Sequence, residues 1–301
     1  MFDDRRRGWA LAAFGMLMVS TDSAFIRAAD FDAWTIAFVF GAASAIALSI
    51  VFAASSPIGP AVAFRLAPVP LLAVAMLSAG TQLAFTAAVN NTAVSNVVVI
   101  VAATPIVAAS LAWLVLRERT EPRVAAAIAV AVAGIVIVVS GSIGEPTLDG
   151  DLLAAVAVVL FSGALVIWRR HPEIDRRLAL AVASTIMAFV AAPFASLGDA
   201  PARVYVAAGL MGLIFNPIGR MSYTTAPKYA PVSEVVLFTP IETVAATVWA
   251  WAFFSERPPA GTVVGGTVVI AAVLYGTLGR RPRPPVRTRS GATEDRRDGV
   301  S

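Results

Sequence analysis

The sequence predicts an all-α integral membrane protein with ten transmembrane helices, arranged as two inverted five-helix repeats with both termini in the cytoplasm. Composition, an internal repeat and the placement of positive charge predict this fold. The 301 residues are 58% hydrophobic and 14% charged, with a mean hydropathy of +0.79, whereas soluble domains are about a quarter charged. Apolar runs of about 20 residues predict helices that cross a bilayer. No stretch has the alternation of a membrane β-barrel.

Turn and loop residues divide the apolar sequence into ten segments. The first segment follows Arg5, Arg6 and Arg7, as a signal peptide would, but no small-x-small cleavage site follows it, and we expect a retained helix. The predicted spans are residues 9–26, 34–53, 70–88, 93–116, 124–140, 152–168, 178–197, 204–223, 232–254 and 261–278.

The distribution of positive charge predicts the orientation. With the N-terminus inside, only three of the 23 Lys and Arg residues fall in outer loops: Arg27, Arg203 and Arg257. Arg220 lies within a span, and the other nineteen lie on the inner side. Cytoplasmic loops carry an excess of Lys and Arg, so the sequence predicts that both termini are cytoplasmic. This placement also explains the pI of about 10.1 without a nucleic-acid partner.

The internal repeat aligns residues 94–119 with residues 232–257, 138 positions later, and the same register places Ser78 and Gln82 over Asn216 and Arg220. A repeat of half the chain in an apolar protein is typical of duplicated transporter folds. Five spans per half is an odd number, so the halves should have opposite orientations. The predicted units are a first repeat at residues 8–141, a second repeat at residues 150–279, and a disordered cytoplasmic tail at residues 280–301.

Each half ends its fourth predicted span on a related motif. The first reads Thr104-Pro105 and then Leu116-Arg117-Glu118-Arg119, and the second reads Glu242-Thr243 and then Phe254-Ser255-Glu256-Arg257. With ten spans, these motifs resemble the EamA-type branch of the drug/metabolite transporter superfamily over residues 8–279. That family often has Pro where this chain has Thr243, and Trp-Gly where the first span has Val19-Ser20-Thr21-Asp22-Ser23. The resemblance implies transport of amino acids, other metabolites or drugs, often outward.

Ionisable residues within spans are costly and are functional candidates by default. Glu242 lies near the middle of the ninth span, Arg220 lies in the eighth, and Asp22 lies in the outer third of the first. Asn216 and Tyr223 share a helical stripe with Arg220, and the repeat pairs Gln82 with Arg220, Thr104 with Glu242, and Asn96 with Glu234. The candidate substrate-binding or coupling residues are Asp22, Gln82, Asn96, Thr104, Asn216, Arg220, Tyr223 and Glu242.

The same residues also allow structural roles. Glu242 could form an ion pair with Arg220 that holds the bundle together, Arg220 could extend to the cytoplasmic interface, and Asp22 could cap a neighbouring helix. Glu118 is expected at a helix end rather than in a binding site. Glu234 is expected near a helix N-terminus, where the helix dipole favours a carboxylate.

The function predicted is secondary transport by alternating access, with export of small metabolites such as amino acids or related amphiphilic solutes across the inner or plasma membrane. A membrane helper or lipid-handling protein without a solute pathway remains the alternative. An enzyme is not expected, because His171 and Lys228 are the only residues of their kinds and both lie in loops. Without Cys and with one His, we expect no metal and no cofactor. The expected partners are a small solute and the lipid bilayer, with a monomer as the transport unit and a homodimer as a further possibility.

Overall fold

The computed structural model describes residues 2–91, 97, 100–139, 148–254 and 260–277. Within these residues every regular element is a helix, and no strand occurs. Seven helices are long and apolar enough to cross a membrane, and three shorter apolar helices accompany them (Thr104–Leu116, Pro122–Ile137 and Val263–Thr277). The prediction of an all-α protein rich in membrane-spanning helices is therefore confirmed for the described chain. Ten crossings and cytoplasmic termini stay predictions.

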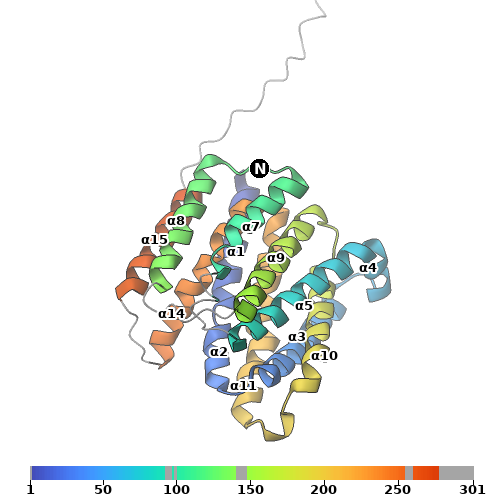
Figure 1. Cartoon of the computed structure of the whole chain (residues 1–301). Coiled ribbons are helices and arrows are strands. Elements are labelled where there is room, and N and C mark those ends of the chain that lie inside the picture. The colour runs from blue at the N-terminus through green and yellow to red at the C-terminus, as the bar shows by residue number, and fades with distance from the viewer. Residues whose placement is uncertain (1, 92–96, 98–99, 140–147, 255–259, 278–301) are drawn as a thin grey trace, which may run out of the picture.

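Figure 1 shows how the helices are arranged. The first half of the chain contains α1 (Phe2–Val19), α2 (Asp22–Ala29), α3 (Ala33–Ser55), α4 (Pro60–Leu66), α5 (Pro68–Asn91), α7 (Thr104–Leu111), the π-helix η1 (Ala112–Leu116) and α8 (Pro122–Val139). The second half begins with α9 (Leu148–Arg170), α10 (Arg176–Ala191), the short 3-10 helices η2 (Ala192–Phe194) and η3 (Leu197–Asp199), and α11 (Ala202–Leu210). It continues with the π-helix η4 (Met211–Phe215), α12 (Asn216–Thr225), the 3-10 helix η5 (Ala226–Lys228), α13 (Val232–Val235), the 3-10 helix η6 (Val236–Phe238), α14 (Pro240–Phe254) and α15 (Ala260–Thr277).

Side-chain caps fix where two of the long helices begin. The Asp32 carboxylate accepts a hydrogen bond from the backbone N–H of Thr35 (2.9 Å) at the start of α3. The Asp175 carboxylate accepts from the N–H groups of Arg177 (2.9 Å) and Leu178 (3.3 Å) at the start of α10. Such caps satisfy N–H groups that have no partner within the helix, so the polar residues between apolar runs define the helix starts.

The main helix pairs join the two halves of the chain. Helix α1 packs on α12, α3 on α10, α5 on α9, and α8 on α15. The predicted repeats begin at residues 8 and 150, so α1 of the first corresponds to α9 of the second, and the register of Gln82 over Arg220 matches α5 with α12. Exchanging the halves therefore converts the pair of α1 and α12 into the pair of α9 and α5. This pairing is the one expected for two related halves that pack against each other.

Glycine allows the closest of these contacts. A Cβ atom on Gly15 of α1 would lie 2.7 Å from both the carbonyl oxygen of Gly219 and the backbone N of Tyr223 on α12. In the pair of α8 and α15, a Cβ on Gly134 would lie 3.0 Å from the carbonyl oxygen of Gly265. Small residues let helix backbones approach closely where van der Waals packing holds membrane helices together.

Several predicted spans are interrupted. The first is broken between α1 and α2, where the hydroxyls of Ser20 and Thr21 donate to the carbonyls of Leu17 (2.6 Å) and Met18 (2.7 Å). Such bonds compete with the helix ladder. The eighth span passes through η4 before Pro217, and the ninth passes through η6 before Pro240, because proline has no N–H to donate. The short α4 occupies part of the connection predicted between the second and third spans.

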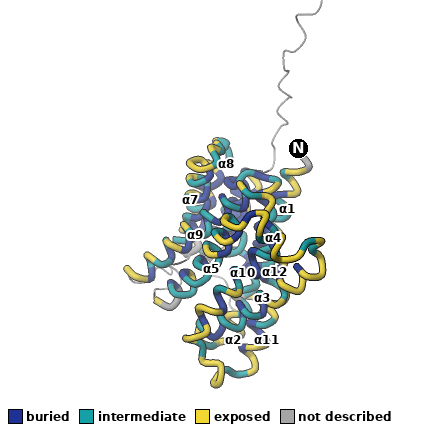
Figure 2. The backbone as a smooth tube through the Cα atoms, turned by 90° about the vertical axis from the view of Figure 1, so that its right-hand side faces the viewer, coloured by how far each residue is buried: buried dark blue, intermediate teal, exposed yellow. Residues whose placement is uncertain are grey.

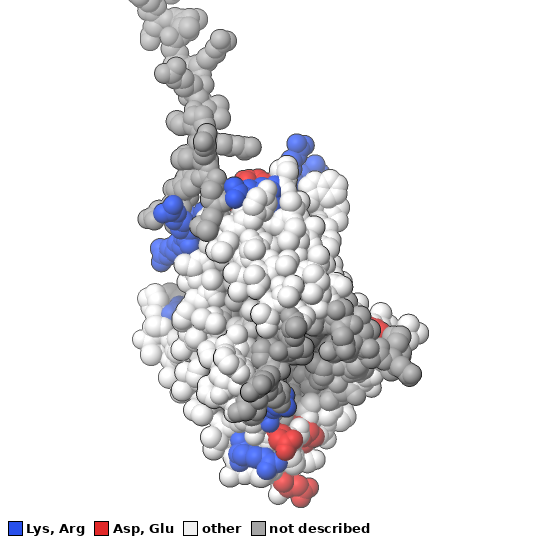
Figure 3. All heavy atoms as spheres, turned by 90° about the vertical axis from the view of Figure 1, so that its left-hand side faces the viewer, with Lys and Arg blue, Asp and Glu red and all other residues white. Residues whose placement is uncertain are grey.

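The outer surface has the polarity of a membrane protein. Large apolar side chains are widely exposed, including Phe189 at 80% and Ile50 at 62%, and exposed positions run along the outside of the helices (Figure 2). Most of the charged side chains on the face shown in Figure 3 lie toward the two ends of the molecule. A broad apolar belt between charged ends suits a lipid environment.

Candidate functional site

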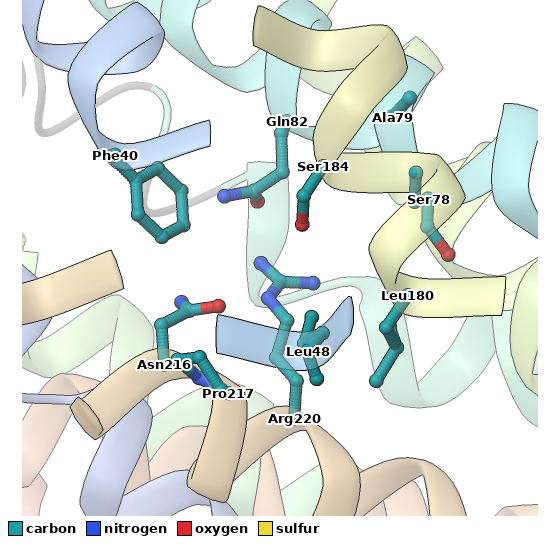
Figure 4. A pocket seen from close by; sticks show the side chains of 11 residues that line it. Phe40, Leu48, Ser78, Ala79, Gln82, Leu180, Ser184, Asn216, Pro217 and Arg220 are labelled. Carbon is teal, nitrogen blue, oxygen red and sulfur yellow. The ribbon is translucent and has the colours of Figure 1, made fainter. Parts of the chain in front are cut away.

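A small cavity with a partly polar lining lies where α5 and α10 meet α3 and α12. Its volume is about 20 Å³, which is room for about one water molecule. Its polar lining consists of Ser78, Gln82, Ser184, Asn216 and Arg220. In Figure 4 the Arg220 side chain extends from α12 toward Gln82 and Ser184, which approach from the opposite side. The cavity therefore brings hydroxyl, amide and guanidinium groups from both halves of the chain together.

Helix geometry places these groups. Asn216 and Arg220 are four residues apart on α12, and Ser78 and Gln82 are four residues apart on α5, so each pair shares one helix face. The two pairs, which correspond in the sequence repeat, line the same cavity. The structure thus brings together three of the predicted site residues: Gln82, Asn216 and Arg220.

Asp22 joins this group through Asn216. The Asn216 side-chain amide donates to Asp22 Oδ2 at 2.6 Å, and Asn216 is only 3% exposed. The other carboxylate oxygen of Asp22 is buried and has no hydrogen-bond partner in the described chain. Asp22 lies in the first turn of α2, where the helix dipole favours negative charge. The Asp22 carboxylate is therefore fixed beside the cavity residue Asn216, and its Oδ1 can accept a further hydrogen bond.

Arg220 has no direct ionic partner among the described residues. Across the described chain, no carboxylate lies within 4.0 Å of its guanidinium, and its buried Nε has no hydrogen-bond acceptor. It interacts electrostatically with both Asp22 and Glu242. A contact ion pair between Glu242 and Arg220, one of the structural roles considered above, is not formed in this conformation. The guanidinium has donors available for another acceptor.

Glu242 and Tyr223 complete the cluster and do not line the cavity. Glu242 lies in the first turn of α14, two residues after Pro240, and interacts electrostatically with Arg220 and Tyr223. Tyr223 is 2% exposed and stacks on Phe161, with ring centroids 5.9 Å apart. Its hydroxyl has no partner among the described residues. A buried polar group without a hydrogen bond costs about 1–3 kcal/mol, so this hydroxyl is a candidate to bind water or solute.

The other predicted residues lie elsewhere. Thr104 is buried, but its hydroxyl donates to the carbonyl of Val101 at 2.6 Å and it does not line the cavity. Asn96 lies outside the described residues, as do Glu256 and Arg257. Sequence reasoning missed Ser184, which lines the cavity from α10. Its signal in the sequence is the hydroxyl pair Ser184-Thr185 in an apolar segment, and such hydroxyl residues are common in membrane helices.

Polar contacts close the molecule at the end that carries the N-terminus. The Glu118 carboxylate accepts hydrogen bonds from the Arg169 guanidinium at 2.7 Å and from the backbone N–H of Val232 at 3.3 Å. Arg169 also donates to the carbonyl of Pro227 at 2.7 Å. These bonds join the segment after η1 in the first half to α9, η5 and α13 in the second, and so close the bundle at the N-terminal end.

Glu234 adds a second contact at this end. Its buried carboxylate accepts from the indole N–H of Trp9 at 2.8 Å and lies 3.7 Å from Arg5. It lies in the first turn of α13, as expected, but it also fastens that helix to α1. Glu118 and Glu234 therefore each link the two halves of the chain.

Comparison with known proteins identifies the chain's relatives. A solved structure titled "Crystal structure of protein" is similar over 90% of this chain and 96% of its own, with a TM-score of 0.79 and 14% sequence identity; at that identity the similarity concerns the fold alone. No curated protein gives a significant match. The profile of the EamA-like transporter family matches residues 6–140 and 148–277. Because that match covers most of the sequence in two segments, the chain belongs to the EamA-like transporter family.

Proposed function

We propose that this protein is a secondary transporter that carries a small amphiphilic solute, such as an amino acid, between its two halves by alternating access. The observation that carries the proposal is the set of unpaired polar groups at the cavity. The side chains of Ser78, Gln82 and Ser184 have no hydrogen-bond partner in the described chain, and Arg220 has no ionic partner. Polar groups at membrane depth are energetically costly, and those that a membrane protein retains there usually serve a function.

The chemistry of the cluster favours a zwitterionic or amphiphilic solute. An arginine guanidinium forms strong, often bidentate hydrogen bonds with a carboxylate, so Arg220 suits the acidic end of an amino acid. Glu242 and Asp22 would then accept an amine or a proton. A phosphate-rich solute would require several cations at this depth, whereas Arg220 is the one cation among the described residues that line the cavity.

The conformation described here suits the closed intermediate of an alternating-access cycle. The cavity holds about one water molecule, so a solute enters only after the halves separate. The contacts of Glu118 and Glu234 close the N-terminal end, and breaking them would open the cavity on that side. We propose that this side is the cytoplasm, that transport runs outward across the inner or plasma membrane, and that one chain is the transport unit.

Metabolite profiling of cells and medium tests the proposal. Cells that express wild type, Arg220→Gln, Glu242→Gln or the control Arg65→Gln at matched levels are compared with empty-vector cells. Arg65 lies exposed in the last turn of α4, away from the cavity. We expect solutes enriched in the medium with wild type and Arg65→Gln, but not with Arg220→Gln. If wild-type cells give the same profile as empty-vector cells, a broad solute panel is then tested in reconstituted vesicles. No transport of any of these solutes would favour a helper protein instead.

Proton coupling has a separate test in the same vesicles. We propose that Glu242 carries the proton, because it is a carboxylate near the middle of its span that electrostatics link to Arg220. Glu242→Gln should then abolish the dependence of transport on a pH gradient while solute binding persists. Full gradient-driven transport by Glu242→Gln would remove Glu242 from the coupling.

A further inference from the structure

An open groove lies on the outside of the bundle between α7 with η1 and α8. Its volume is about 630 Å³, within the range of about 300–1,000 Å³ typical of small-molecule sites. Ile106 and Trp113 form one wall and are 49% and 58% exposed. Ala129 on α8 belongs to the opposite wall, and Arg119 and Thr120 lie at one end. The groove is therefore apolar along its length and cationic at its end.

The groove exists because two consecutive helices pack on different neighbours. Helix α7 packs on α9, whereas α8 packs closely along α15. The contact of Gly134 with α15 holds α8 there. Figure 1 shows α8 beside α15 at one edge of the molecule, with α7 nearer its centre. The space between α7 and α8 is a consequence of this pairing.

Arg119 has no partner in the described part of the chain, whereas its charged neighbours Glu118 and Arg123 both have one. Glu118 pairs with Arg169 at 2.7 Å, and Arg123 donates to the carbonyl of Tyr275 and lies over its ring. Arg119 forms no hydrogen bond or ion pair with any described residue. Thr120 adds a hydroxyl beside it. The end of the groove thus presents an available guanidinium at the edge of an apolar surface.

The location of Arg119 indicates which surface of the membrane it faces. Glu121, two residues further along, lies 3.6 Å from Arg5, so this connection adjoins the basic N-terminal segment. The sequence predicts that this end is cytoplasmic. Anionic lipids give that leaflet a negative surface potential that attracts Lys and Arg.

We propose that this groove binds one anionic phospholipid, with its phosphate on Arg119 and Thr120 and an acyl chain along Ile106 and Trp113. Charge selects this occupant, because the guanidinium matches a phosphate in geometry and sign, and the apolar walls match a hydrocarbon chain. The site is separate from the transport cavity and requires only that the protein lies in a bilayer. A bound lipid would fill the space between α7 and α8.

Native mass spectrometry of the full chain in detergent tests the proposal. Phosphatidylglycerol is titrated in parallel with phosphatidylcholine that carries the same acyl chains. We expect one tightly retained phosphatidylglycerol on the wild type and about tenfold weaker retention on Arg119→Gln, the effect of losing one charge-assisted hydrogen bond. The matched control is Arg117→Gln, which removes an exposed charge two residues away that does not line the groove. Equal retention of the two lipids, or equal losses in the two arginine variants, would overturn the proposal.

A second pair of variants tests the apolar part of the groove. Ala129→Phe places a ring in the groove, whereas Ala126→Phe adds the same ring at an exposed position of α8 that does not line it. Only Ala129→Phe should lose the retained lipid while both variants elute as the wild type in size-exclusion chromatography. If the wild type is a dimer that Ala129→Phe dissociates, the groove is an interface between two copies and the proposal fails. If Ala129→Phe retains the lipid as the wild type does, the proposal also fails.

Discussion

The contact between α1 and α12 makes a quantitative prediction, because it sets the position of Arg220. A methyl group at Gly15 would lie 2.7 Å from the carbonyl oxygen of Gly219 and 2.7 Å from the backbone N of Tyr223. These atoms belong to backbone and cannot rotate away, so Gly15→Ala must separate the two helices. Overpacking of this kind costs about 1–3 kcal/mol, and the alanine's gain in helix propensity of about 1 kcal/mol leaves a net loss of up to about 2 kcal/mol.

The matched control is Gly209→Ala on α11, where a Cβ meets nothing within 4 Å. That variant should gain stability by up to about 1 kcal/mol, because alanine favours the helix more than glycine does. The assay is unfolding of both purified variants in the same detergent, followed by circular dichroism. We expect Gly15→Ala to unfold at a lower temperature than the wild type, and Gly209→Ala at the same temperature or higher. A Gly15→Ala protein as stable as Gly209→Ala would refute the close packing described for α1 and α12.

Three further predictions concern polar contacts. Glu118→Gln weakens the charge-assisted bond from Arg169 (2.7 Å) and should speed amide hydrogen exchange in the segment before α13; unchanged exchange would argue against a closing contact. Asn216→Ala removes the donor to Asp22 (2.6 Å) and should lower the free energy of unfolding by about 1–3 kcal/mol; no loss of stability would contradict that bond. At Asp175, burial opposes ionisation, but hydrogen bonds from the side chain of Arg177 and from backbone N–H groups outweigh it and hold the pKa below the ordinary 3.8. The contribution of ionised Asp175 to the free energy of unfolding is therefore complete above pH 3.8 and lost as pH falls through the lowered pKa. Asp175→Asn should then reduce the fall in stability at acid pH. A dependence of stability on pH identical to that of the wild type would count against this role.

Much of the cavity's composition could be predicted from the sequence. The repeat register related Ser78 and Gln82 to Asn216 and Arg220, and the structure places these four residues around one cavity. The reason is that i and i+4 positions share a helix face, and corresponding helices of related halves meet at the same place. The all-α class likewise follows from apolar runs of membrane-spanning length. The inverted orientation of the halves is a prediction that the structure does not test.

Other features depend on contacts that one sequence does not contain. The hydrogen bond between Asn216 and Asp22 joins residues 194 positions apart. Tyr223 shares a helix with Arg220, but it packs on Phe161 and does not line the cavity. The break after Val19 arises from competition between hydroxyl groups and the helix ladder, which a hydropathy profile does not register. The groove beside Arg119 exists because α7 packs on α9 and α8 packs on α15, and these contacts are set by tertiary packing.

The central claim is that the cavity at Arg220 opens alternately to the two sides of the membrane. The chain contains no cysteine, so Ser184→Cys places a single thiol in the cavity lining. The measurement is modification of that thiol by a membrane-impermeant maleimide added to one side at a time of oriented vesicles. We predict modification from each side, and slower modification when a transported solute is present. Modification from neither side, or from one side only, would contradict alternating access through this cavity.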